Sequence, residues 1–176
     1  MQFLSQKGRA FYPAFLFVLL MLHINHAYSA ELKFPAYTEQ KVVFDFYFDQ
    51  PEKINAALFW IRSYMNPLMD APYNQAPEFM NIKVIIHGRE LVVLAKKNYA
   101  KYKDAVERMK YYASLGVQFK ACALATADFG YTPKDLYDFV EVVPSAMTEL
   151  VHWQMKGYGL ITPRILFKNN RNEDIR

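Results

Sequence analysis

Cys122 is the residue best suited to covalent chemistry, because it is the only cysteine among the 176 residues of the chain. A thiolate here could act as a nucleophile or carry sulfur as a persulfide. A free cysteine is also one of the residue types most often buried in protein cores. Judged on spacing alone, a buried and inert Cys122 is the commoner case, and both alternatives stay open.

His87 and Gly88 form a second candidate centre, at the end of a predicted strand. The imidazole of His87 could act as a base or orient a ligand, and it could equally be hydrogen-bonded to nearby backbone. Asp49 and Ser145 stand at the starts of predicted helices, where capping explains them more simply than catalysis does. We therefore take Cys122 as the candidate catalytic residue and the other four as candidate ligand-binding residues.

Strands alternate with helices in the predicted order of elements. Runs rich in β-branched and aromatic residues predict strands at 41–48, 81–87, 117–124, 140–143 and 158–161. Capping residues followed by apolar residues at helical spacing predict helices at about 51–66, 98–115, 132–139 and 145–156. The proline-containing segment 67–80 between them is predicted to be a surface loop. This order indicates a single α/β domain with a five-stranded, mainly parallel sheet and helices on both faces.

The predicted sheet brings the candidate residues to a common edge. Ligands of open α/β sheets bind beyond the carboxyl ends of the strands. The first strand leads to Asp49, the second to His87 and Gly88, the third to Cys122, and the fourth to Ser145. The sequence therefore predicts a functional site along this edge.

Residues 1–30 are predicted to be a secretory signal peptide. Lys7 and Arg9 supply its positive end, an apolar run covers 10–22, and a more polar segment with small residues follows. The apolar run is shorter than the roughly 20 residues that a membrane-spanning helix needs. We expect cleavage within 27–30 and a periplasmic or secreted protein without membrane association; the alternative is an uncleaved anchor.

The mature chain is predicted to consist of a domain at 31–167 and a polar tail at 168–176. It keeps 21 − 2 = 19 of the basic residues and all 17 acidic residues, a net charge of +2. This balance gives no reason to expect a nucleic-acid partner. With a single cysteine, the exported domain must be stable without an internal disulfide.

Common cofactor and metal motifs are missing. The sequence has no glycine-rich phosphate loop, no C-x-x-C pair and no G-x-S-x-G nucleophile elbow, and the mature chain has no two-histidine metal spacing. We therefore predict no cofactor and no bound metal.

Several short motifs follow one another from the second predicted strand to the end of the domain. They are V-I-I-H-G (84–88), G-V-x-F-x-x-C (116–122), V-E-V-V-P-S-A-M-T-E-L (140–150), Gln154, Gly157-Tyr158 and Pro163. This succession resembles the DsrE-like sulfur-relay family, in particular its exported single-domain members, over roughly residues 41–163.

The resemblance implies a flavodoxin-like α/β/α fold and frequent assembly into homo-oligomers. Cytoplasmic members pass sulfur as a persulfide on a cysteine after the third strand, and Cys122 occupies that place here. It therefore implies an exported sulfur-handling protein with Cys122 as the carrier. The implied partner is a sulfur donor or acceptor protein, or a small sulfur compound.

Two other functions remain open at this stage. The first is a non-catalytic ligand-binding or protein-interaction module that uses the carboxyl edge of the sheet and the loop 67–80. The second is a hydrolase or transferase that works through His87 and Asp49, which requires a pocket uniting these side chains.

Overall fold

The computed structural model describes residues 29–37, 39–166 and 168–176. The chain divides into two units, Met1–Pro35 and Ala36–Arg176. In the first unit the described residues 29–35 form no helix or strand, and the rest of the predicted signal peptide lies outside the described residues. No helix within the described ranges is both long enough and apolar enough to cross a membrane.

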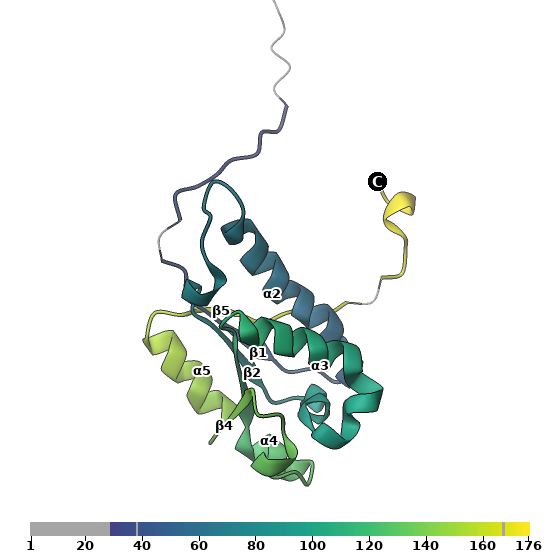
Figure 1. Ribbon diagram of the computed structural model, residues 1–176. Helices are drawn as coiled ribbons and strands as arrows, with labels where there is room; N and C mark the ends of the chain where they lie inside the picture. Colours follow the sequence, from purple (N-terminus) through teal and green to yellow (C-terminus); the bar gives the residue numbers. More distant parts are fainter. Residues whose placement is uncertain (1–28, 38, 167) are drawn as a thin grey trace, which may run out of the picture. The chain divides into compact units, whose positions relative to one another are not determined.

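The second unit contains a five-stranded parallel sheet, which confirms the predicted α/β class (Figure 1). Its strand order is β4-β3-β2-β1-β5, and every neighbouring pair is parallel. The strands are β1 (Val42–Phe46), β2 (Ile82–Ile86), β3 (Gln118–Cys122), β4 (Val140–Val143) and β5 (Gly159–Ile161). The α-helices are α2 (Ile54–Met69), α3 (Tyr99–Ser114), α4 (Ala123–Asp128) and α5 (Ala146–Met155).

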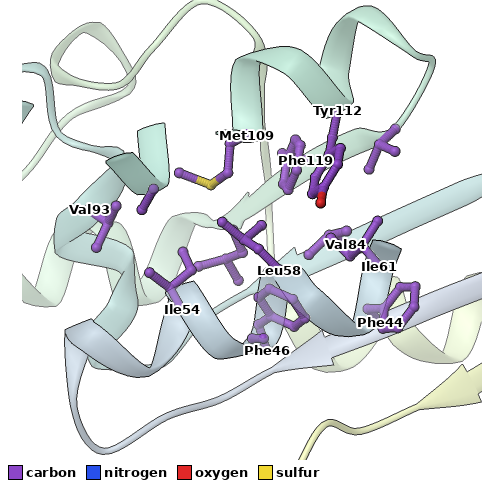
Figure 2. Close-up of a cluster of buried hydrophobic side chains, with 14 of the residues drawn as sticks. Phe44, Phe46, Ile54, Leu58, Ile61, Val84, Val93, Met109, Tyr112 and Phe119 are labelled. Atoms are coloured by element: carbon purple, nitrogen blue, oxygen red, sulfur yellow. The ribbon is translucent and has the colours of Figure 1, made fainter. Parts of the chain in front are cut away.

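Helices cover both faces of the sheet, as the three-layer prediction requires. On one face, apolar side chains of β1, β2 and β3 pack against α2 and α3 (Figure 2). On the other face, Val43, Ile85 and Cys122 pack against Ala146 and Leu150 of α5. The change of face follows from topology. From β1 to β4, each strand lies beside the preceding one on the same side, whereas β5 lies on the opposite side of β1. Because crossovers between parallel strands are right-handed, α5 lies on the opposite face of the sheet from α2 and α3.

Helix α2 continues into the segment that was predicted to be a loop. It ends at Met69 rather than near residue 66, and it includes Pro67 in its last turn. Leu68 is buried in the same core as Met65, so the apolar spacing of the helix extends past the proline. Burial of Leu68 stabilises this last turn despite the backbone N–H that Pro67 lacks.

The third strand is shorter than predicted, because α4 begins directly after Cys122. Residues 123–128 (ALATAD) include three alanines, the residue with the highest helix propensity. The hydroxyl of Thr126 donates a hydrogen bond to the carbonyl oxygen of Cys122 and fixes this transition. The prediction of a strand reaching residue 124 was therefore wrong at its end.

The predicted helix at 132–139 is only a 3-10 turn, Pro133–Asp135. Its start has the expected capping, since the Asp135 carboxylate accepts hydrogen bonds from the N–H and hydroxyl of Thr132. Beyond the turn, Leu136 forms an antiparallel bridge with Ala95, and the N–H of Tyr137 donates to the carbonyl of Leu94. These tertiary bonds keep the chain extended where a helix would otherwise continue.

Candidate functional site

A cavity of about 670 Å³ opens at the carboxyl edge of the sheet. It lies beyond the ends of β1, β2 and β5, where the strand order reverses around β1. Such reversal points are the usual ligand sites of open α/β sheets, and the volume is within the range of small-molecule pockets. Its lining residues are Tyr47, Phe48, Asp49, Lys53, His87, Gly88, Arg89, Ala125, Asp128, Phe129, Pro163, Arg164, Ile165 and Leu166.

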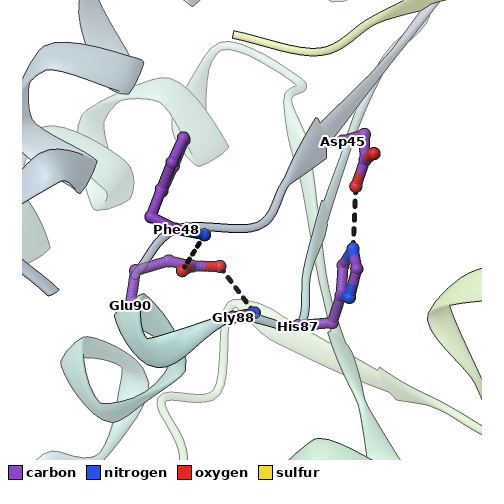
Figure 3. A network of polar contacts seen from close by, with 5 residues as sticks. All are labelled: Asp45, Phe48, His87, Gly88 and Glu90. Carbon is purple, nitrogen blue, oxygen red and sulfur yellow. Dashed lines mark hydrogen bonds and ion pairs between the residues drawn. The ribbon is translucent and has the colours of Figure 1, made fainter. Parts of the chain in front are cut away.

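A buried carboxylate joins the segments that follow β1 and β2 (Figure 3). Glu90 is fully buried, and its two oxygens accept hydrogen bonds from the backbone N–H groups of Phe48 and Gly88, each at 2.9 Å. Burial raises the pKa of Glu90, while the two backbone hydrogen bonds act in the opposite direction. Glu90 thus holds two cavity-lining segments together.

Gly88 is required by the close approach of these segments. A Cβ atom at this position would lie 2.8 Å from the carbonyl oxygen of Phe48, and nearer still to the Phe48 nitrogen and the Glu90 carboxylate. The backbone N–H of Arg89 also donates to Phe48 at 2.9 Å. The prediction that Gly88 belongs to the site therefore has a steric basis.

His87 is held by a carboxylate from the neighbouring strand. Its Nε2 lies 2.7 Å from Oδ1 of Asp45, and both side chains are mostly buried. Figure 3 shows this contact between the two strands. The Tyr47 ring stacks on the imidazole with a centroid distance of 4.8 Å. This arrangement orients the imidazole and leaves Nδ1 available for proton transfer or ligand contact.

Asp45 is a functional candidate that the sequence analysis did not select. The signal was present, because Asp45 is the only acidic residue in an otherwise apolar strand. Glu90 was also missed, and no local pattern distinguishes it, because its partners come from two separate strand ends. Asp45 and Glu90 each form hydrogen bonds that connect β1, or the segment after it, with the segment after β2.

Cys122 lies at the end of β3, with 6% of its surface exposed, and it is not among the residues that line the cavity. Since Ile86 pairs in register with Ala121, the next residues, His87 and Cys122, follow side by side on neighbouring strands. Side chains alternate along strands, so both project toward the face covered by α5. Ala125 lines the cavity and also packs against the cluster containing Cys122, which places this cluster directly behind the cavity wall.

The other two predicted residues differ in their placement. Asp49 lines the cavity, but it does not cap the following helix: Gln50 holds that position, and the Asp49 carboxylate pairs with the Lys53 ammonium at 2.7 Å. This ammonium lowers the pKa of Asp49. Ser145 occupies the expected N-cap position of α5 without a side-chain capping bond, and it does not line the cavity.

The predicted residues are thus only partly united. His87, Gly88 and Asp49 share one cavity, Cys122 adjoins it, and Ser145 stands apart. His87 pairs with Asp45 instead of Asp49, so the pair assumed for a hydrolase does not form. Within the described ranges, no group of three or more His, Cys, Asp or Glu side chains is arranged to hold a metal ion.

Comparison with known proteins decides the family. The model of the DsrE/DsrF-like family matches residues 41–163, which is most of the chain. The chain belongs to the DsrE/DsrF-like family. The resemblance inferred from its motifs is therefore confirmed, and so is the flavodoxin-like α/β fold that it implied.

Two solved structures share the fold of this DsrE-like protein. MTH1491 from Methanobacterium thermoautotrophicum, a protein of unknown function, is 22% identical, with a TM-score of 0.54 and coverage of 70% of this chain and 99% of its own. BT1422 from Bacteroides thetaiotaomicron, also of unknown function, is 13% identical, with a TM-score of 0.50 and coverage of 70% and 95%. At these identities the likeness shows the fold alone. No functionally curated protein matches the chain.

Proposed function

We propose that this DsrE-like protein handles sulfane sulfur, with Cys122 as the persulfide carrier. Membership of the family suggests a sulfur-relay-like role. The observation that carries the proposal is the Asp45–His87 pair, at 2.7 Å, on the same edge and face of the sheet as Cys122. A carboxylate, an imidazole and a thiol then follow one another across β1, β2 and β3, the order in which a base is oriented and a nucleophile activated.

The proposed step is a thiol exchange that needs no external oxidant. The Cys122 thiol loses its proton to Nδ1 of His87, and the thiolate attacks the sulfane sulfur of a donor such as thiosulfate or a persulfide. A new S–S bond forms on Cys122 as the S–S bond of the donor breaks. The electron pair leaves with the remaining fragment, as sulfite or a thiolate, so atoms and electrons balance.

The donor would reach Cys122 from the strand-end cavity. Ala125 lines the cavity and packs against the cluster that contains Cys122, and His87, another lining residue, follows β2 at the register position beside Cys122. Ala146 within that cluster and Ala125 packed against it both have small side chains. A modest movement of α4 relative to β3 would therefore open the thiol to the cavity.

Mass spectrometry tests this proposal directly. After incubation with thiosulfate or polysulfide, the folded protein should gain about 32 Da, the mass of one sulfur atom, on the peptide that contains Cys122. Reductant should remove the added mass. The Cys122→Ser variant should gain none, and a wild-type protein that stays unmodified would refute the sulfur-carrier function.

A second candidate function is ligand binding without sulfur chemistry. The burial of Cys122 and its absence from the cavity lining favour this alternative. It predicts that Cys122→Ser binds the cavity ligand as tightly as the wild type and that the wild-type thiol gains no sulfur.

We also propose that the protein acts in the periplasm or outside the cell and forms a homo-oligomer. The composition of residues 1–30 supports export, and cell fractionation tests it: full-length protein confined to the cytoplasm would contradict export.

Exposed Met147, Val151 and Met155 repeat at helical spacing on α5 and support self-association. Analytical ultracentrifugation should give a mass above that of one chain. A sulfur donor or acceptor protein remains the alternative partner to a small compound.

A further inference from the structure

Among the charged side chains that line the cavity and form no ion pair within the described residues, positive charges outnumber negative ones. Asp49 is neutralised by Lys53 at 2.7 Å, and Asp45, which does not line the cavity, is engaged by His87. Arg89 and Arg164 also line the cavity, and within the described ranges neither guanidinium has a carboxylate partner. Asp128 is the single lining carboxylate without an ion pair among the described residues. The lining thus contains two guanidinium groups and one carboxylate outside the ion pairs of the described residues, which leaves a net capacity for an anion.

The rest of the wall is apolar. Phe129 from the end of α4 and Ile165 and Leu166 from the segment after β5 line the same cavity as the two arginines. Leu166 is 80% exposed, so this lining residue presents a large apolar side chain to solvent. An inorganic anion would use only the arginines, whereas a ligand with an apolar body would also cover this surface.

We propose that the cavity binds a small organic anion, with a carboxylate-like headgroup at Arg89 and Arg164 and an apolar body against Phe129, Ile165 and Leu166. Guanidinium groups form charge-assisted hydrogen bonds with carboxylates, sulfonates and phosphates, often in pairs. Arg89 lies in the segment after β2 and Arg164 in the segment after β5, so a single headgroup would join these two segments of the cavity wall.

The inference also specifies the sulfur donor, and this part rests on the proposed function. A donor bound in this way would be an organic persulfide that carries an acidic group, and after transfer it would leave as the organic thiolate. Binding of the anion itself does not involve the thiol. Failure of sulfur transfer and failure of anion binding are therefore separate results.

Calorimetric titration with three probes tests the binding. Octanoate combines a carboxylate with an apolar body, acetate has only the carboxylate, and 1-octanol has only the apolar body with a neutral headgroup. Octanoate should bind the full-length protein with one site per chain, and the other two probes should bind at least about tenfold more weakly. The double variant Arg89→Gln/Arg164→Gln should bind octanoate at least about tenfold more weakly.

Arg62→Gln is the matched control, because Arg62 is an exposed arginine of α2 that contacts the Phe59 ring and does not line the cavity. It should bind octanoate like the wild type. The inference is overturned if octanoate does not bind, if 1-octanol binds equally tightly, or if the double variant binds as Arg62→Gln does. Cys122→Ser should retain octanoate binding even if the sulfur-carrier function fails.

Discussion

Replacing Gly88 by alanine is expected to lower the free energy of unfolding by about 3 kcal/mol or more, the upper range of effects from overpacking a buried site. The added methyl group would lie 2.8 Å from the carbonyl oxygen of Phe48 and would meet the Glu90 carboxylate as well. These are backbone and fully buried atoms, so the clash is relieved only by separating the ends of β1 and β2. The separation would break the hydrogen bonds that Glu90 accepts from Phe48 and Gly88.

Denaturant unfolding followed by circular dichroism measures this loss. Gly159→Ala is the matched control, since a Cβ at Gly159 in β5 would have only an ordinary contact, 3.7 Å from a backbone oxygen of Lys41. That variant should change stability by less than about 1 kcal/mol. Equal stabilities of the two alanine variants would contradict the role assigned to Gly88.

The parallel sheet was predictable because the local sequence around each strand indicates its position. A short apolar run is followed by a capping signal and an amphipathic segment, as at Val42–Phe46 and the helix α2 after it. Sequences of this kind leave few topologies open, because crossovers between parallel strands are right-handed. Gly116 and Gly157 directly follow the C-caps of α3 and α5, and they have positive φ angles of 93° and 83°, as residues just past a helix end often do.

The errors occurred where tertiary contacts override local preference. The turn at Pro133–Asp135 does not become a helix because Leu136 and Tyr137 bond to the segment around Leu94 and Ala95. No local pattern reveals such long-range bonds. The end of α2 shows the opposite case, in which burial of Leu68 maintains a helix past Pro67.

The site was predictable only to the level of the sheet edge. The rule that ligands bind beyond the strands placed His87, Gly88 and Asp49 together, and they share the cavity. The rule does not specify which side chains pair. Asp45 and Glu90 define the geometry of the site through partners on other segments, and those partners become visible only in the folded chain.

Replacing His87 by asparagine is expected to slow the persulfidation of Cys122 by about a hundredfold, the lower range of general-base contributions. Asparagine is similar in size and polar, but it cannot take up the thiol proton. The Asp45 carboxylate orients the imidazole at 2.7 Å, so Asp45→Asn should give a smaller reduction in the same direction. Both variants should still carry sulfur on Cys122 after long incubation.

His152→Asn is the control for this series. His152 is exposed on α5, and its ring contacts Trp153 rather than the cavity. The variant should load sulfur at the wild-type rate. If His152→Asn loaded sulfur on Cys122 as slowly as His87→Asn does, the location of His87 beside Cys122 would not explain the effect.

The rate at which iodoacetamide alkylates Cys122 in the folded protein shows whether this thiol is accessible and activated, because the chain has no other thiol. If His87 activates Cys122, alkylation proceeds without denaturant, at a rate that falls by about a hundredfold in His87→Asn under conditions in which both proteins stay folded. This activation would be contradicted by a thiol that reacts only as the whole domain unfolds, at a rate that does not depend on residue 87.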